Sequence, residues 1–180
     1  MLTAKLQDYQ ASEVLADGSQ ITVRALHPED KPILQEGMHH LSKNSLYNRF
    51  FTWKTELSPK ELSFFTELDF VDHVGLLASL VTPEGERPLG VGRYIACKEL
   101  KSIHAAEIAF AVDEEFQGRG IGKLLMKHLI VIGRQNHVKL FVAYVLPGNR
   151  KMLAVLYGSG LPVTRNQDEA GVLEIRLRLT

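Results

Sequence analysis

The sequence contains a single cysteine, Cys97, and its 21 basic residues balance its 21 acidic residues, so its formal net charge is zero. One cysteine cannot form a disulfide within the chain, which excludes a disulfide-stapled fold and fits a reducing compartment. A zero net charge provides no overall field that attracts nucleic acid or an anionic membrane. The N-terminus lacks the apolar core of a signal peptide, and no apolar run reaches the roughly 18 residues that cross a bilayer. We therefore expect a cytoplasmic protein with no nucleic acid and no membrane as partner.

The histidines and the cysteine do not follow the spacing of a metal site. His39 and His40 are neighbours, and neighbours on a helix point about 100° apart. No Cys or His spacing resembles a zinc site, so we expect no bound metal. Cys97 follows the apolar run from Val91 to Ala96. This position favours a buried thiol at the end of a strand over a nucleophile.

The length of 180 residues and the hydrophobic content of 45% are sufficient for one domain with a sizeable core. Residues 1–18 are mixed in character and end at the turn signal Asp17-Gly18. We expect them to form a loosely tied N-terminal arm, and residues 19–180 to form the domain.

Hydrophobic periodicity and turn residues predict the order of the elements. Ser58-Pro59-Lys60-Glu61 has the pattern of a capping box that opens a helix. The segment 42–53 mixes aromatic and polar residues and is expected to be a loop. The predicted helices cover 28–41, 58–68, 121–135 and 150–157, and the predicted strands cover 21–24, 74–81, 89–96, 105–113, 139–145 and 172–179. This order indicates a mixed α/β sheet with helices on both faces.

Three alternating glycines, Gly118, Gly120 and Gly122, stand between a predicted strand and a predicted amphipathic helix. Glycine lets a backbone approach a ligand closely, and the helix N-terminus that follows attracts anions. The loop therefore predicts a phosphate cradle, with a flexible surface turn as the alternative. It lacks the Lys-Ser or Lys-Thr of a P-loop and does not meet the dinucleotide-binding fingerprint.

The sequence from Gln117 to Gly122, QGRGIG, resembles the acyl-CoA pyrophosphate loop of the GNAT N-acetyltransferase superfamily. Over residues 41 to 160 the chain is similar to the acetyltransferase domain of bacterial protein-lysine acetyltransferases of the Pat type. The residues that carry this similarity are Ser45, Tyr47, Arg49-Phe50-Phe51, Leu57-Ser58-Pro59, Leu68-Asp69-Phe70, Asp72-His73, Ala106-Glu107, Asn149 and Met152-Leu153. The resemblance implies the GNAT acyl-CoA N-acyltransferase fold, with a central, mostly antiparallel sheet and helices on both faces.

The resemblance also implies acetyl-CoA as a co-substrate, without a metal. The end of the strand before the loop would contact the pantetheine arm, and the amides of the loop would bind the pyrophosphate. Asn149 matches an asparagine that often contacts the coenzyme. The implied coenzyme-binding residues are Phe110, Ala111, Val112, Gln117, Gly118, Arg119, Gly120, Ile121, Gly122, Lys123 and Asn149.

Glu107 matches the general base of the Pat-type enzymes, and its position supports that role independently. On a strand, Glu107, Ala109 and Ala111 point to one face, where the two alanines leave room for a ligand. A lysine amine is protonated at neutral pH and must lose a proton before it attacks a thioester. The alternative is a surface glutamate at a strand edge.

Tyr157 is the candidate general acid, but it departs from the family pattern. Many members carry a tyrosine at the position that is Leu156 here, and one residue corresponds to about 100° around a helix. We predict transfer to a protein lysine, with a small amine as the alternative acceptor and segment 42–57 bordering the acceptor groove. Because the tyrosine is displaced, a non-catalytic acyl-CoA-binding regulator is a third hypothesis. The sequence leaves the oligomeric state open and is compatible with a homodimer.

Overall fold

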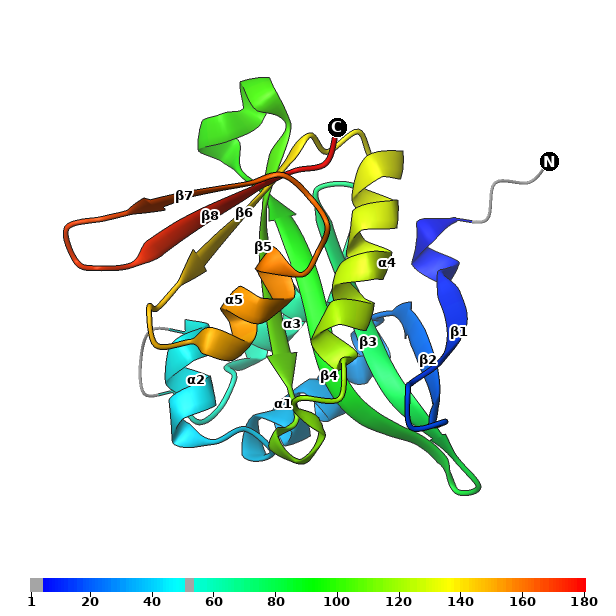
Figure 1. Ribbon diagram of the computed structural model, residues 1–180. Coiled ribbons are helices and arrows are strands. Elements are labelled where there is room, and N and C mark those ends of the chain that lie inside the picture. Colours follow the sequence, from blue (N-terminus) through cyan, green and yellow to red (C-terminus); the bar gives the residue numbers. More distant parts are fainter. Residues whose placement is uncertain (1–4, 51–53) are drawn as a thin grey trace.

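The computed structural model describes residues 5–50 and 54–180, and its described part is built on one eight-stranded sheet (Figure 1). The strands are β1 (Gln10–Val14), β2 (Gln20–Ala25), β3 (His73–Thr82), β4 (Gly85–Ala96), β5 (Ala105–Val112), β6 (Leu140–Val145), β7 (Val163–Gln167) and β8 (Leu173–Arg178). The α-helices are α1 (Lys31–His39), α2 (Lys43–Phe50), α3 (Pro59–Thr66), α4 (Ile121–Gln135) and α5 (Arg150–Tyr157). Short 3₁₀ helices are η1 (Leu6–Asp8), η2 (Pro28–Asp30), η3 (Lys98–Ile103) and η4 (Glu114–Phe116).

The strand order is β1-β2-β3-β4-β5-β6-β8-β7, and the pairs are antiparallel except for β5 with β6. These two parallel strands pair only through residues 105–107 and 140–142. Beyond this short ladder the strands diverge, as Figure 1 shows. The expected mixed, mostly antiparallel sheet is confirmed, and its single parallel pair opens into a gap.

Helices cover both faces of the sheet. The buried face of α4 packs with the inner residues of β3 and β4 in the larger core cluster, to which Leu125, Leu129 and Ile132 belong. On the opposite face, α1, α2 and α3 enclose a smaller cluster that includes Leu34 and Leu46. The sheet therefore separates two apolar layers, and each helix presents the apolar stripe that its periodicity predicts.

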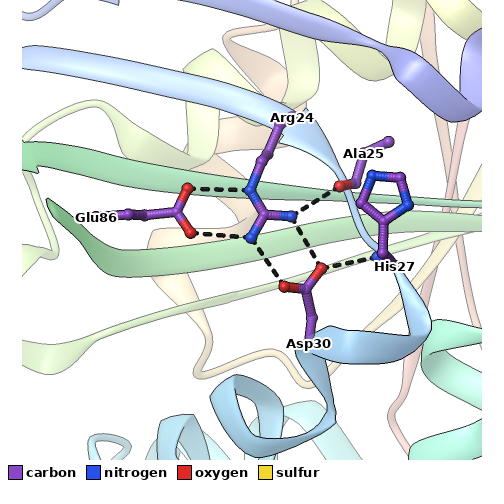
Figure 2. Close-up of polar contacts among 5 residues, drawn as sticks. All are labelled: Arg24, Ala25, His27, Asp30 and Glu86. Carbon is purple, nitrogen blue, oxygen red and sulfur yellow. Dashed lines mark hydrogen bonds and ion pairs between the residues drawn. The ribbon is translucent and has the colours of Figure 1, made fainter.

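An ion-pair network fixes the start of α1 against the sheet (Figure 2). Arg24 of β2 contacts Asp30 at 2.8 Å and Glu86 of β4 at 2.9 Å. The backbone N–H of His27 donates to Asp30 Oδ2 at 2.7 Å. Burial acts to raise the pKa of Asp30, but the hydrogen bonds from Arg24 and His27 outweigh it and hold that pKa below its ordinary value. The carboxylate thus stays charged and anchors α1.

The predicted capping box is confirmed at the start of α3. The N–H of Glu61 donates to Ser58 Oγ at 3.2 Å, and the N–H of Ser58 donates to Glu61 Oε2 at 2.7 Å. The predicted hairpin of β3 and β4, the strands β2, β5, β6 and β8, and the helices α4 and α5 are confirmed as well. Within the described residues, none of the helices has both the length and the apolar character of a bilayer span.

The expectation of a loose arm over residues 1–18 is wrong for its described part. β1 pairs with β2 from Gln10 opposite Arg24 to Val14 opposite Gln20. β1 also lies against α4, because Tyr9 Oη contacts His128 Nδ1 at 2.5 Å and Glu13 contacts His128 Nε2 at 2.9 Å. The strand was missed because alternate side chains of β1 are exposed and the others are only half-buried, which leaves a weak hydrophobic pattern.

The loop expected over 42–53 is a helix, α2, from Lys43 to Phe50, while residues 51–53 lie outside the described residues. The N–H of Ser45 donates to Ser42 Oγ at 3.0 Å, so Ser42 caps the helix as serine commonly does. β7 was also missed, because four of its five residues are exposed and the segment carries little apolar signal.

Candidate active site

A cleft of about 920 Å³ opens between β5 and β6 and reaches the N-terminus of α4. Its wall brings together residues that the sequence predicts for the coenzyme and the general base. These are Glu107, Phe110, Ala111, Val112, Gln117, Gly118, Gly120, Ile121, Gly122, Lys123 and Asn149. Two predicted site residues, Arg119 and Tyr157, are not on this wall.

The cleft exists because the β5–β6 ladder stops early. Glu107 pairs with Val142 at its last rung, although β5 continues to Val112 and β6 to Val145. The other edge of β5 stays paired with β4 over its length. The cleft therefore borders an extended backbone whose hydrogen-bonding groups are not used by β6, which suits an extended amide-containing chain.

The glycine loop leads directly into α4. Gly118 and Gly120 have φ of +77° and +93°, a region that L side chains rarely adopt, and α4 begins at Ile121. The first turn of a helix leaves N–H groups unsatisfied, and its dipole favours an anion there. A Cβ on Gly122 would lie 2.9 Å from Val155 Cγ2, so glycine allows α5 to approach α4 closely.

Side chains hold the loop in place without filling the cleft. Gln117 Nε2 donates to the carbonyl of Val112 at 3.0 Å, and Gln117 Oε1 accepts from Lys151. The guanidinium of Arg119 lies 4.9 Å from the centre of the ring of Phe116, a residue of the cleft wall. Asn149 Oδ1 accepts from the N–H of Met152 at 3.2 Å and so caps α5.

These residues fit an acyl-CoA thioester. The loop and the first turn of α4, with Lys123 beside them, would hold the pyrophosphate. The separated edge of β5 at Phe110, Ala111 and Val112 would pair with the pantetheine amides. The thioester, which supplies the electrophilic carbon of acyl transfer, would then lie toward Glu107.

Glu107 lies beside a cation. Partial burial raises the pKa of its carboxyl group, and the nearby charge of Arg49, on α2, acts in the opposite direction. Burial in turn lowers the pKa of the Arg49 guanidinium. The Glu107 side chain remains accessible from the cleft, so a substrate can reach it. A carboxylate with a raised pKa and access to the reacting end is suited to accept a proton.

The tyrosine on the cleft wall is Tyr144 of β6, which sequence reasoning missed. Tyr157 is 47% exposed at the end of α5, and Leu156 is completely buried. Burial, followed by the charges of Glu174, Cys97 and Glu107, raises the pKa of the Tyr144 phenol. Tyr144 lies two residues after Val142, the partner of Glu107, and so shares its face, but strand alternation indicates this only once the pairing of β5 with β6 is known.

A second, smaller cavity of about 390 Å³ lies on the side of the sheet that carries α1 and α3. It shares part of its wall with the cleft, at Leu41, Arg49, Ala109 and Ala111. Among the described residues, His, Cys, Asp and Glu side chains form no group of three or more that could hold a metal ion.

Comparison with known proteins agrees with this geometry. The sequence model of the acetyltransferase (GNAT) family matches residues 40–157. The chain is 30% identical to acetyltransferase PA5475 of Pseudomonas aeruginosa over 168 residues, which cover 93% of this chain and 88% of that protein. It therefore belongs to the GNAT acetyltransferase family.

Solved structures give the same result. The crystal structure of the GNAT domain of S. lividans PAT is similar, with a TM-score of 0.84 and 33% identity, and the match covers 94% of this chain and 96% of that one. The structure of yncA from Salmonella typhimurium, with its cofactor acetyl-CoA, has a TM-score of 0.71 at 17% identity, covering 89% and 94% of the two chains. This last similarity shows the fold alone.

Proposed function

We propose that this protein transfers an acetyl group from acetyl-CoA to the side-chain amine of a protein lysine. One observation carries the proposal: Glu107 lies where β5 and β6 separate, on the wall of a cleft suited to an acyl-CoA. The similarity to the GNAT domain of S. lividans PAT supports lysine as the acceptor to test first.

In this proposal Glu107 accepts the proton of the lysine ammonium, directly or through a water. The neutral amine attacks the thioester carbon, so a C–N bond forms and the C–S bond breaks without a covalent enzyme intermediate. The leaving thiolate takes a proton from a tyrosine. We propose Tyr144 for this role, because it lies on the cleft wall and shares the face of Glu107, whereas Tyr157 is the sequence prediction.

Replacing Glu107 tests the proposal. We expect Glu107→Gln to lower kcat with a protein-lysine acceptor by about 10²- to 10⁴-fold, the range typical of general bases, and to remove the acid limb of the pH profile. Glu99→Gln is a matched control, since Glu99 is exposed on η3 and lines neither cavity. An unchanged rate and pH profile in Glu107→Gln rules out Glu107 as the base.

A small amine is the second candidate acceptor, and the apolar cavity beside the cleft favours it. Its volume of about 390 Å³ is in the range of small-molecule sites. Offering protein substrates and small amines with radiolabelled acetyl-CoA separates the two acceptors. Label on protein supports the first candidate, and label only on small amines supports the second.

The exposed position of Tyr157 leaves a third candidate, a regulator that binds acyl-CoA without transferring the acyl group. Calorimetry distinguishes it from both enzymes. Tight binding of acetyl-CoA with no acyl transfer to proteins of a cell extract or to small amines supports the regulator, and any turnover that depends on Glu107 contradicts it.

A further inference from the structure

The smaller cavity has an apolar body and a cationic wall. α1, α2, α3 and the strands β3, β4 and β5 border it, and its apolar lining includes Ile33, Leu34, Met38, Leu57, Leu77 and Val91. Arg49 and Arg93 lie among these residues. A guanidinium is costly to bury in apolar surroundings unless an anion or several hydrogen-bond acceptors compensate it. The burial of Arg93 therefore needs a physical explanation.

Arg93 is the more deeply buried of the two, with an exposed fraction of 5%. Its Nη1 donates to the carbonyl of Phe65 at 3.2 Å and to His73 Nε2 at 3.2 Å, and its guanidinium lies 4.2 Å from the centre of the Phe65 ring. These partners are neutral, and within the described residues no acidic side chain pairs with Arg93. Residues 1–4 and 51–53 contain no Asp or Glu that could do so.

Arg49 adds a second positive charge to the same region. Burial and, after it, the charge of Arg49 lower the pKa of Arg93 to about 9, so Arg93 is still charged at neutral pH. Two neighbouring cations in a low-dielectric cavity repel each other. The charge of Glu107 acts on Arg49, whereas an anion at Arg93 would offset both the repulsion from Arg49 and the cost of burying the Arg93 guanidinium.

The acidic groups of the cavity lie elsewhere on its wall. Asp113 contacts His40 Nδ1 at 3.2 Å and accepts the N–H of Glu115 at 2.9 Å. Glu36 is exposed and contacts the rings of His39 and His40 at 3.5 Å. The net positive end of the cavity is therefore at Arg93. On the neighbouring strand β5, Arg93 pairs with Ala109, which lies two residues from Glu107 and points to the same face of the sheet.

We propose that this cavity binds a carboxylate carried on a short aliphatic body, with Arg93 as the anchor and Arg49 as the second cation. The small side chains of Ala109 and Ala111, which line both cavities, let such a group extend from the reacting carbon into the cavity. Its place beside the reaction rests on the proposed function. Two sources share this chemistry: the acyl group of a dicarboxylic acyl-CoA, and an amine acceptor that carries a carboxylate.

The donor source is tested with the unmodified protein. Binding of acetyl-, butyryl-, succinyl- and glutaryl-CoA is measured by calorimetry, and turnover is measured by release of the CoA thiol. If the donor supplies the carboxylate, succinyl- or glutaryl-CoA binds about ten- to a hundredfold more tightly than butyryl-CoA, as expected for hydrogen bonds to charged groups. The acceptor source is tested with leucine and leucinamide and with acetyl-CoA as donor. A preference of the same size for leucine assigns the carboxylate to the acceptor.

Variants connect the preference to Arg93. Arg93→Met abolishes the preference for the carboxylate ligand, and Arg93→Lys retains part of it. Arg165→Met is the charge-removal control, because Arg165 is exposed on β7 and lines neither cavity. A thermal melt shows whether Arg93→Met folds. If it does not fold, the Arg93→Lys variant and the ligand series on the unmodified protein still test whether the cavity binds a carboxylate.

Two results overturn the proposal. Equal affinity for succinyl-, glutaryl- and butyryl-CoA together with equal use of leucine and leucinamide excludes a carboxylate site, and so does a carboxylate preference that Arg93→Met and Arg93→Lys leave unchanged. Failure of the proposed function looks different. In that case no donor is turned over, yet the calorimetric comparison of succinyl- and butyryl-CoA still reports on the cavity.

Discussion

Glu107 and Val142 form the last rung of the ladder between β5 and β6. Past this pair the two strands separate, so the proposed base lies at the point where the cleft begins. The same rung fixes the direction of Tyr144, two residues after Val142 on the same face of the sheet. A carboxylate and a phenol are thus directed to one side of the sheet by a single backbone register.

The charge of Arg49 should control the pH dependence of turnover. Arg49 acts to lower the pKa of Glu107, so Arg49→Met should raise that pKa further. A base with a higher pKa is protonated up to a higher pH, and the acid limb of kcat/KM should therefore move to higher pH. Lys43→Met, an exposed change on the same helix, is the control. An acid limb that stays in place, or moves to lower pH, contradicts the electrostatic coupling of Arg49 to Glu107.

The two tyrosines can be separated by removing one hydroxyl group at a time. Tyr144→Phe should lower kcat by at least about a hundredfold if its phenol protonates the leaving thiolate, and it should change the alkaline limb of the pH profile. Tyr157→Phe should leave both unchanged, because Tyr157 is exposed and outside the cleft wall. The reverse pattern would assign the proton to Tyr157, as the sequence predicts.

Gly120 should be required for its backbone conformation. Its φ of +93° costs a residue with a Cβ about 1–2 kcal/mol, so Gly120→Ala should destabilise the fold by about that amount and raise KM for acetyl-CoA. Gly37→Ala, in helix α1, is the contrast, because a Cβ built at Gly37 meets no atom within 4 Å. It should stabilise the protein by about 0.5–1 kcal/mol. Denaturant unfolding measures the stability of both variants. An equal loss of stability in Gly120→Ala and Gly37→Ala would contradict the explanation.

His73 should make stability fall in mild acid. Burial and, after it, the charge of Arg93 lower the pKa of His73 from 6.5 to about 4. Between these values the unfolded chain binds more protons than the folded one, so stability is fully present above pH 6.5 and is lost as the pH falls toward 4. The loss is at most about 3 kcal/mol.

Unfolding of His73→Gln over this range measures that contribution, and its stability should vary less with pH than that of the unmodified protein. His39→Gln, a change at an exposed histidine, serves as the control. An equal pH dependence in His73→Gln and the unmodified protein would exclude His73 as its source.

The grouping of the glycine loop and Glu107 on one cleft wall could be predicted because its information is local. The glycines, the helix that follows and the alternation around Glu107 are contiguous, and all act through backbone geometry. Tyr144 required knowledge that β6 pairs with β5, and the role of Arg93 required the packing of α1 and α3 above β4. Arg93 lies in the otherwise apolar stretch 89–96 of β4, and no neighbour in the sequence indicates that its partners are Phe65 and His73.

The same reasoning explains the fold elements that were missed. β1 and β7 are the two edges of the sheet, and edge strands bury only part of one face, so their hydrophobic pattern is weak. The helix α2 has a serine cap but a mixed aromatic and polar composition that resembles a loop. Its position becomes clear only from its contacts, such as Ser45 with Glu114.

The contact between Gly122 and Val155 bears on how this enzyme family can vary. With no side chain at Gly122, the spacing of α4 and α5 is set by Val155, and any larger residue at position 122 would push the two helices apart. Because both helices border the cleft, the width of the cleft depends on the lack of a Cβ atom at Gly122. A single substitution there would therefore reshape the cleft while leaving Glu107 in place, so that under the proposed function coenzyme binding and chemistry would change independently.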